Sequence, residues 1–188
     1  MTTNKKASTH SRIFEDELLP HIEALHTFAY HLTYNEDDAA DLVQETYLKA
    51  YRFIDKYDIG TNAKAWLFRI LKNAYINEYR KKTRTPQHTD IDANTTTTAD
   101  LGGDVNDLRH DIFENAMGDE ITAALNALSV EFRTIILLCD VEGFSYEEMA
   151  QILDIPIGTV RSRLHRARQA FKELIRNYAT TLGYNVEK

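Results

Sequence analysis

Residues 146–168, YEEMAQILDIPIGTVRSRLHRAR, predict two helices joined by a tight turn. Ser145, just before this stretch, and Glu148 have the spacing of a capping box, in which two side chains satisfy free backbone amides at a helix start. We expect the first helix to end near Leu153, because a short turn follows and Pro156 suits the first position of a second helix. A short helix, a tight turn and a second helix make up the helix-turn-helix pattern.

The second helix of this pattern has one apolar and one basic face. Apolar side chains recur along one side: Ile157, Val160, Leu164, Ala167, Phe171, Leu174 and Ile175. Basic side chains recur along the opposite side, with Ser162 and Arg166 beside them: Arg161, His165, Arg168, Lys172 and Arg176. Helix-turn-helix proteins place their second helix in the major groove of DNA, where Arg can pair with guanine. This face is therefore predicted to bind DNA, and a charged face that meets only solvent is the alternative.

The charge of the chain is unevenly distributed. Its 188 residues include 22 Lys+Arg against 29 Asp+Glu, a formal net charge of −7. Residues 61–84 nevertheless carry seven Lys/Arg and one Glu, and residues 161–176 carry six Lys/Arg and one Glu. Residues 85–120, between them, carry nine Asp/Glu and one Arg. Two basic segments in an acidic chain favour contact with nucleic acid at two separate places.

The apolar content and the cysteine count exclude several classes of protein. Hydrophobic residues make up 43% of the chain, which is enough for packed cores. The longest strongly apolar run, residues 135–139, is too short to cross a bilayer, and the N-terminus lacks the apolar segment of a secretion signal. We therefore expect a soluble, cytoplasmic protein. A single cysteine, Cys139, excludes an internal disulfide and is expected to be buried and unreactive.

Three helices are predicted in the N-terminal half from apolar residues spaced three or four apart. The first covers residues 13–32, with a break near Pro20, and is expected to turn these side chains inward: Leu18, Ile22, Leu25, Ala29 and Leu32. Asn35 is expected to cap the second, whose first turn is acidic and which runs to about Phe53. The third should cover about residues 65–84, ending just before a proline.

The next segment, residues 87–112, is rich in Thr and Asp and has too few apolar residues to offset the entropy lost on ordering. It is predicted to be a flexible acidic linker. Helical spacing resumes near Phe113. Ser129 is expected to cap a further helix that runs through Val141 and is closed by Gly143.

Three segments of the chain carry a resemblance to one family, and they occur in that family's order: DDAADLVQETYLKAY, GTNAKAWLFRILKNAYINEYRKK and GFSYEEMAQILDIPIGTVRSRLHRAR. They resemble the polymerase-binding helix, the minus-ten-reading segment and the minus-thirty-five-binding helix-turn-helix of bacterial sigma-70 factors, specifically the small extracytoplasmic-function (ECF) group. The resemblance implies an all-α chain of two small domains, residues 11–86 and 113–180, joined directly by the linker.

The resemblance also implies contacts residue by residue. One set would bind the clamp of the polymerase's largest subunit: Asp41, Gln44, Glu45 and Leu48. A second would contact the minus-ten element: Asn62, Lys64, Trp66, Arg69, Asn73, Asn77 and Arg80. A third would contact the minus-thirty-five element: Thr159, Arg161, Ser162, Arg163, His165 and Arg166. Asparagine offers a donor and an acceptor to a base edge, and cationic side chains can follow the DNA backbone.

Further partners are implied in the same way. The helix-turn-helix domain would meet the flap of the second-largest polymerase subunit, and an anti-sigma factor would hold the free protein. FEDELLPHIEALHTFAYHLT and GTNAKAWLFRILKNAYINEYRKK look closest to the branch whose anti-sigma partner contains zinc and senses thiols. The resemblance implies no catalytic activity and no cofactor.

Two other functions are weighed against this interpretation. An autonomous helix-turn-helix repressor or activator would use the N-terminal helices to dimerise or to bind an effector, and would not copurify with polymerase. An enzyme could use the carboxylates clustered near Asp38 and Asp41, but charge at a helix start explains them. His21, His26 and His31 recur at five residues, which scatters them around a helix instead of aligning them for a metal.

Overall fold

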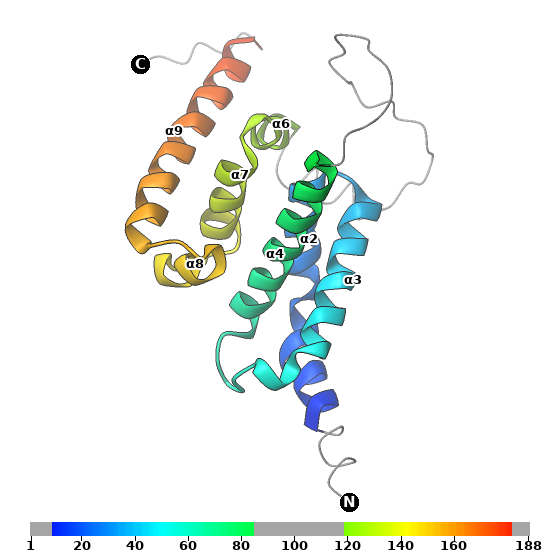
Figure 1. The fold of residues 1–188 in the computed structure, drawn as a ribbon. Coiled ribbons are helices and arrows are strands. Elements are labelled where there is room, and N and C mark those ends of the chain that lie inside the picture. Colours follow the sequence, from blue (N-terminus) through cyan, green and yellow to red (C-terminus); the bar gives the residue numbers. More distant parts are fainter. Residues whose placement is uncertain (1–8, 85–118, 182–188) are drawn as a thin grey trace, which may run out of the picture.

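The protein is all-α, as predicted. The computed structural model describes residues 9–84 and 119–181, and no strand occurs in these two ranges. The N-terminal unit contains α2 (Ile22–Thr33), α3 (Glu36–Arg52) and α4 (Ala63–Arg84). The C-terminal unit contains α6 (Asp119–Ala127), α7 (Val130–Ile136), α8 (Tyr146–Leu153) and α9 (Ile157–Thr181). Figure 1 shows the two units side by side. The predicted linker, residues 87–112, and the predicted helix start at Phe113 lie outside the described residues.

The first predicted helix is interrupted around Pro20. A π turn, η1 (Phe14–Leu18), and a 3-10 turn, η2 (Leu19–His21), precede α2. Leu18, Leu25, Ala29 and Leu32 are buried as predicted. The prediction that Ile22 faces inward is wrong, because this side chain is 45% exposed. Ile22 is the first residue of α2, and its side chain lines an open groove between α2 and α3 instead of packing in the core.

Helix α2 ends on Tyr34, which has φ 52° in the left-handed region and whose amide binds the Tyr30 carbonyl at 2.7 Å. Glycine is the residue usually found there, because a side chain crowds the backbone at positive φ. Asn35 follows and caps α3 as predicted: its side-chain oxygen accepts a hydrogen bond from the Asp38 amide at 2.9 Å. The cap fixes the start of α3 and so which of its faces is buried.

Helix α4 starts two residues earlier than predicted. The side-chain oxygen of Asn62 accepts a hydrogen bond from the Ala65 amide at 2.9 Å, which makes Asn62 the cap and Ala63 the first helical residue. Leu67 and Leu71 are fully buried, and a short 3-10 turn, η3 (Ile54–Lys56), lies in the connection from α3. The helix runs to Arg84 as predicted.

The C-terminal unit begins its central helix as predicted. Ser129 caps α7 by accepting a hydrogen bond from the Phe132 amide at 3.4 Å. The helix continues into a π turn, η4 (Leu137–Val141), and Gly143 follows with φ +72°, a conformation that costs glycine little. Both predicted boundaries of this element are therefore confirmed.

The helix-turn-helix forms from α8 and α9. Both halves of the predicted capping box are present: the Ser145 hydroxyl accepts from the Glu148 amide at 3.2 Å, and the Glu148 carboxylate accepts from the Ser145 amide at 2.8 Å. Asp154, with φ 57°, ends α8. The predicted place of Pro156 inside α9 is off by one residue. Its carbonyl accepts the first intrahelical bond, from Val160 at 3.1 Å, which makes Pro156 the cap.

The two units pack against each other through one continuous core. Helix α4 packs on α8, and α2 touches α7. The rings of Phe68 in α4 and Phe144 before α8 meet edge to face at 5.0 Å, and Phe28 lies 4.9 Å from Phe68 on the other side. The sequence predicts two domains but contains no signal for this packing. No helix among the described residues combines the length and the apolar character needed to cross a lipid bilayer.

Candidate functional surfaces

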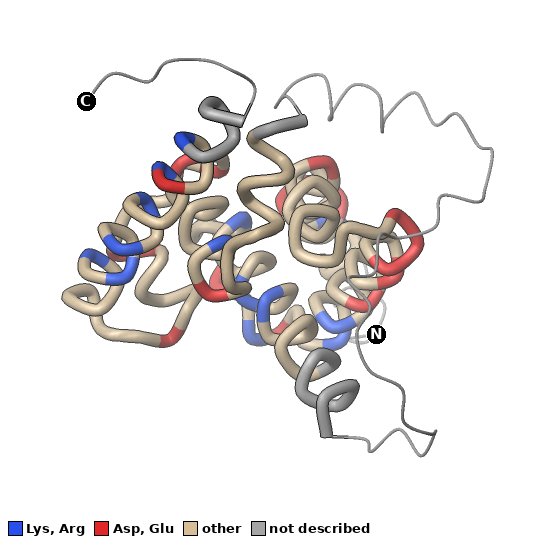
Figure 2. The backbone as a smooth tube through the Cα atoms, turned by 90° about the horizontal axis from the view of Figure 1, so that it is seen from above, with Lys and Arg blue, Asp and Glu red and all other residues tan. Residues whose placement is uncertain are grey.

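The basic face of α9 is the first candidate surface. Arg161, Ser162, His165 and Arg166 are exposed, and Val160 and Leu164 on the opposite side are buried, as the helical wheel predicts. Figure 2 shows Lys and Arg positions recurring along this helix. The α8–turn–α9 geometry leaves this face open, which is the arrangement that lets a second helix enter a major groove.

Some α9 side chains are already engaged within the C-terminal unit. Arg168 pairs with Asp140 through Nε at 3.2 Å and also through a terminal nitrogen. Arg163 is half-buried and lies 3.8 Å from the Glu131 carboxylate. Arg161 stands over the Tyr146 ring at 5.9 Å. Arg168, which was predicted to lie on the basic face, is therefore engaged in an ion pair that joins α9 to η4.

The exposed face of α3 is the second candidate surface. It carries the four predicted polymerase contacts together: Asp41, Gln44, Glu45 and Leu48, all exposed. Leu48 is 66% exposed, unusual for a leucine on a packed helix. Glu45 pairs with Lys49 at 2.6 Å. The adjacent face, with Val43 and Thr46, is buried.

A groove of about 400 Å³ opens beside this face, between α2 and α3. Its lining is mostly apolar: Ile22, Glu23, His26, Ala40, Val43, Gln44 and Tyr47. The sequence analysis missed it, because the groove depends on the exposure of Ile22, which the α-helical phase had placed inside. Gln44 belongs to both the groove and the α3 face.

The start of α4 is the third candidate surface, and it faces the C-terminal unit. The Asn62 side-chain amide donates to the Glu148 carboxylate at 2.5 Å. Lys64 donates to the Glu142 carbonyl at 3.1 Å and pairs with the Glu142 carboxylate at 2.8 Å. Asn62 and Lys64, both predicted to contact DNA, thus bind the carboxylates of Glu148 and Glu142 at the helix-turn-helix.

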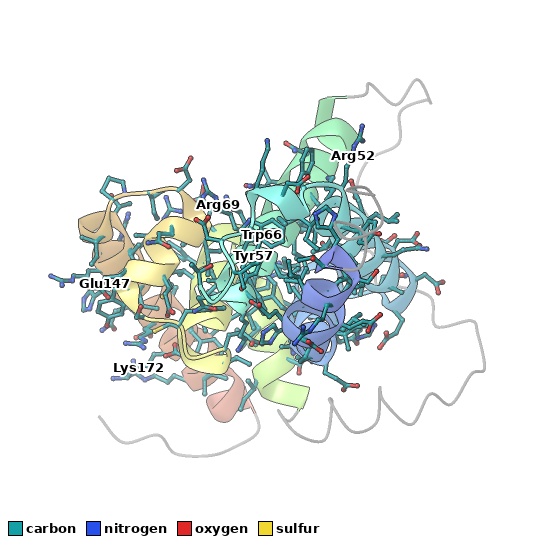
Figure 3. The ribbon with its side chains drawn as sticks, turned by 90° about the horizontal axis from the view of Figure 1, so that it is seen from below. Arg52, Tyr57, Trp66, Arg69, Glu147 and Lys172 are labelled. Atoms are coloured by element: carbon teal, nitrogen blue, oxygen red, sulfur yellow. The ribbon has the colours of Figure 1, made fainter. Side chains whose placement is uncertain are left out.

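The loop before α4 is held by a residue that sequence reasoning missed. The Glu17 carboxylate lies 2.5 Å from the Tyr57 hydroxyl and accepts from the Gly60 amide at 3.3 Å. Desolvation first, and then the hydrogen bond to Glu17, raise the pKa of Tyr57 to about 12. Trp66 is half-buried, and its ring lies 5.2 Å from that of Tyr57. Figure 3 shows the two residues side by side. Trp66 thus packs on the loop through its ring.

Further along α4 the polar stripe reaches solvent. Arg69, Asn73 and Asn77 are exposed, and Arg69 borders a shallow pocket against residues 150–157. Figure 3 shows Arg69 close to α8. Arg80 is in the helix, but its side chain lies outside the described residues. The predicted minus-ten set is therefore divided between a part that meets the C-terminal unit and a part that is open.

A buried polar contact joins the two units at a second point. Arg133 of α7 is only 8% exposed and donates to the His31 carbonyl at the end of α2 at 3.2 Å. Its guanidinium stands 4.8 Å over the Tyr34 ring. His31 is 2% exposed, and burial, followed by the charge of Arg133, lowers its pKa. No group of three or more metal-ligating side chains occurs in the described part of the chain.

Comparison with known proteins identifies the family. Residues 19–85 match the Sigma-70 region 2 family and residues 118–171 match the Sigma-70, region 4 family. ECF RNA polymerase sigma factor EcfG of Rhodopseudomonas palustris is 38% identical over 160 residues, covering 85% of this chain and 83% of the relative. The chain belongs to the sigma-70 family.

Other similar proteins are also sigma factors. ECF sigma factor SigE of Mycolicibacterium smegmatis is 35% identical over 167 residues, 88% of this chain, which spans 63% of that relative's length. Among solved structures, the chain is similar to the complex of the sigma factor RpoE with the anti-sigma factor NepR from Bartonella quintana, with a TM-score of 0.67, 36% identity and coverage of 87% of this chain and 96% of that one. The predicted ECF sigma factor assignment is confirmed, and these relatives are initiation factors with no enzymatic activity indicated.

In this sigma factor, α3 and α4 fall in region 2, and α7, α8 and the first 15 residues of α9, up to residue 171, fall in region 4. The polymerase and minus-ten residues predicted from the sequence therefore lie in region 2, and the minus-thirty-five residues lie in region 4. Their individual roles remain predictions. Arg133, Glu142 and Glu17 are the residues that the sequence analysis missed, because each acts through a partner distant in the sequence.

Proposed function

We propose that the sigma factor binds RNA polymerase core through α3, reads the minus-ten element with α4 and reads the minus-thirty-five element with α9. The observation that carries the proposal is the exposed basic face on α9, presented by a capped helix-turn-helix in a chain that matches regions 2 and 4 in order. An autonomous repressor would have no use for the second, Asn-bearing stripe on α4.

At the minus-thirty-five element, the N-terminal turns of α9 would enter the major groove. Arg161 and Arg166 are the residues we propose to pair with guanine, because Arg can bind its O6 and N7 together. Ser162 and Thr159 suit phosphate or base contacts near the helix start. Further along, Lys172 is exposed at a distance from these turns and would contribute at most a phosphate contact.

At the polymerase core, the α3 face would bind the clamp of the largest subunit. Two carboxylates, an amide and an exposed leucine lie together on one face of α3, and the other side of this helix is packed in the core. These groups support the proposal by their chemistry and by their position. A charged rim around an apolar contact is typical of protein interfaces. Region 4 would bind the flap of the second-largest subunit. A factor that meets polymerase and DNA works in the cytoplasm of a bacterium.

At the minus-ten element, Asn73 and Asn77 would bind bases and Arg69 would follow the backbone. Asn62 and Lys64 would join them once their contacts with the C-terminal unit are released. Trp66 would act by supporting the loop before α4, since its ring lies against Tyr57.

We also propose an anti-sigma partner. The solved structure of RpoE contains the anti-sigma factor NepR, and that of CnrH, 24% identical with a TM-score of 0.64, contains the cytosolic domain of CnrY. A zinc-containing, thiol-sensing partner remains a prediction from the sequence. Because the chain has one cysteine, any thiol sensing would reside in the partner.

The test is run-off transcription with purified core polymerase and a set of genomic promoters. We expect promoter-specific transcripts from the wild type, and their loss with Arg161→Ala or Arg166→Ala. Lys172→Ala is the matched control, a basic residue on the same helix that should change activity little. Absence of transcripts, together with tight binding of the chain alone to duplex DNA, would favour the repressor.

A further inference from the structure

The guanidinium of Arg161, in the first turns of α9, lies over the ring of Tyr146, the first residue of α8, with 5.9 Å between Cζ and the ring centroid. We propose that Tyr146 is a positioning residue for promoter recognition: its ring restrains the Arg161 guanidinium on the exposed face of α9 and so sets how strictly one base pair of the minus-thirty-five element is read. The proposal deepens the proposed function and rests on it for the part that concerns DNA. The contact between the two side chains can be measured without DNA or polymerase.

Three arginines on this part of α9 differ in what holds them. Arg168 pairs with the Asp140 carboxylate through two nitrogens, with Nε at 3.2 Å. Arg163 lies 3.8 Å from the Glu131 carboxylate. Arg161 pairs with no carboxylate in the described part of the chain, and an aromatic ring is its neighbour instead. Because an ion pair engages N–H groups that a base would need, Arg161 is the arginine of the three whose donors are open.

A ring restrains a guanidinium without using its hydrogen-bond donors. The negative face of an aromatic ring attracts a cation, whereas a carboxylate accepts hydrogen bonds from it. The contact with Tyr146 therefore leaves the N–H groups of Arg161 free to donate, and two of them suffice to bind O6 and N7 of guanine. A side chain that is restrained before DNA arrives loses less conformational entropy when it binds. It also has fewer alternative partners on a mismatched base pair, so the restraint favours the matching base.

The position of Tyr146 is itself fixed by its neighbours. The capping box of Ser145 and Glu148 encloses it at the start of α8 and sets the backbone on both sides. The Tyr146 side chain is half-buried and packs against the buried core. Helix α8 in turn packs on α9. The ring therefore has the support from its surroundings that a residue needs in order to position another side chain.

Replacing the ring should release Arg161 without removing it. Tyr146→Leu keeps an apolar side chain against the core but has no aromatic face. We expect it to lower the affinity for a promoter with the matching base pair by about two- to fivefold, the value of a cation–aromatic contact at an exposed site. The affinity for promoters mismatched at that base pair should change less, so the base preference is reduced. Tyr146→Phe keeps the aromatic face and should retain both the affinity and the preference.

The first measurement detects the contact in the full chain by nuclear magnetic resonance. Protons that lie over an aromatic ring resonate at a lower frequency than they do in solvent, and the side-chain Nε–H and Cδ–H signals of Arg161 report on this. The Arg161→Ala variant identifies these signals by their absence. We expect them to shift to solvent values in Tyr146→Leu and to stay in place in Tyr146→Phe. Signals that are the same in the wild type and in Tyr146→Leu would refute the contact and overturn the proposal.

The second measurement is the binding of promoter variants by holoenzyme reconstituted with core polymerase. The wild type, Tyr146→Leu, Arg161→Ala and the double variant form a double-mutant cycle. We expect Tyr146→Leu to weaken the preference at the base pair to which Arg161→Ala becomes indifferent, and to have no further effect in the Arg161→Ala background. Tyr146→Leu with Lys172→Ala is the matched control pair, because Lys172 is an exposed basic residue further along α9, and these two effects should add. Additive effects of Tyr146→Leu and Arg161→Ala would overturn the proposal.

The outcomes separate the positioning role from the function on which it rests. If Arg161→Ala changes the base preference and Tyr146→Leu does not, the positioning role is refuted and the promoter-reading role of Arg161 stands. If Arg161→Ala changes nothing although the resonance shift is present, reading by Arg161 fails, and the positioning role fails with it. Equal losses for Tyr146→Phe and Tyr146→Leu at every promoter variant would assign Tyr146 a phosphate contact through its hydroxyl and overturn the proposal. Circular dichroism verifies the helices of each variant.

Discussion

Replacing Ser145 with alanine should destabilise the helix-turn-helix by a predictable amount. The substitution removes the hydroxyl that accepts the Glu148 amide at 3.2 Å and leaves that amide without its cap. Loss of a serine cap costs about 1 kcal/mol. The other half of the box survives, because Glu148 still accepts from the backbone amide of residue 145. Glu148→Ala removes that half and the Asn62 contact as well, so we expect about 2 kcal/mol.

The assay is urea unfolding of the full chain followed by circular dichroism, with thermal melting as a second measurement. Since the two units share one core, a loss of 1 kcal/mol should lower Tm by about 2–4 °C. Ser162→Ala is the matched control. Its hydroxyl donates to the Thr159 carbonyl within the same helix, and alanine is the better helix former, so stability should be equal or slightly higher. Equal losses for Ser145→Ala and Ser162→Ala would refute the capping argument.

Three further outcomes are expected. Reversing two charges on α3 with Asp41→Arg and Glu45→Arg should weaken core polymerase binding, measured by quantitative pull-down, with an unchanged circular dichroism spectrum; unchanged affinity would remove this face from the interface. Glu17→Gln should weaken the hydrogen bond with Tyr57 and loosen the loop before α4, and so reduce the discrimination among minus-ten sequences more than the affinity for duplex DNA. Unaltered sequence preference in binding to promoter variants would count against a positioning role for Glu17. The hydrogen bond from the Ser145 backbone amide lowers the pKa of Glu148, so the ionised carboxylate stabilises the fold above its unfolded pKa, and this stabilisation is lost as pH falls through the folded pKa. Glu148→Gln should therefore reduce the loss of stability at acidic pH, measured by urea unfolding across a pH series. An unchanged loss of stability at acidic pH would contradict the assignment.

Local signals in the sequence were sufficient for most helix boundaries. Asn35, Ser129 and Ser145 cap the helices that they were expected to cap, because capping depends on residues three or four apart. The same reasoning failed at Ile22, which has the spacing of the buried Leu25 and Ala29 in α2 but lines an open groove. It missed Asn62 as a cap because the resemblance had assigned that residue to DNA.

The packing of the two units could not be predicted from the sequence. Lys64 and Glu142 are 78 residues apart, and Arg133 and His31 are 102 apart. No periodic pattern in the sequence reveals either pair. Taken singly, Lys64, Glu142 and Arg133 look like ordinary solvated side chains, because their partners are far away along the chain. The candidate DNA residues of α9 were therefore placed on the correct helix. Lys64 was expected before α4 and lies within it, and the contacts that Asn62 and Lys64 make with the C-terminal unit were not predicted.

The left-handed conformation of Tyr34 has two opposing effects on stability. A tyrosine at φ 52° strains the backbone at the end of α2. Its ring also lies 4.8 Å from the Arg133 guanidinium of α7, a contact that glycine could not make. Glycine at this position would relieve the strain and remove the attraction between the two units. The residue that best fits the turn is therefore not the residue that best joins α2 to α7.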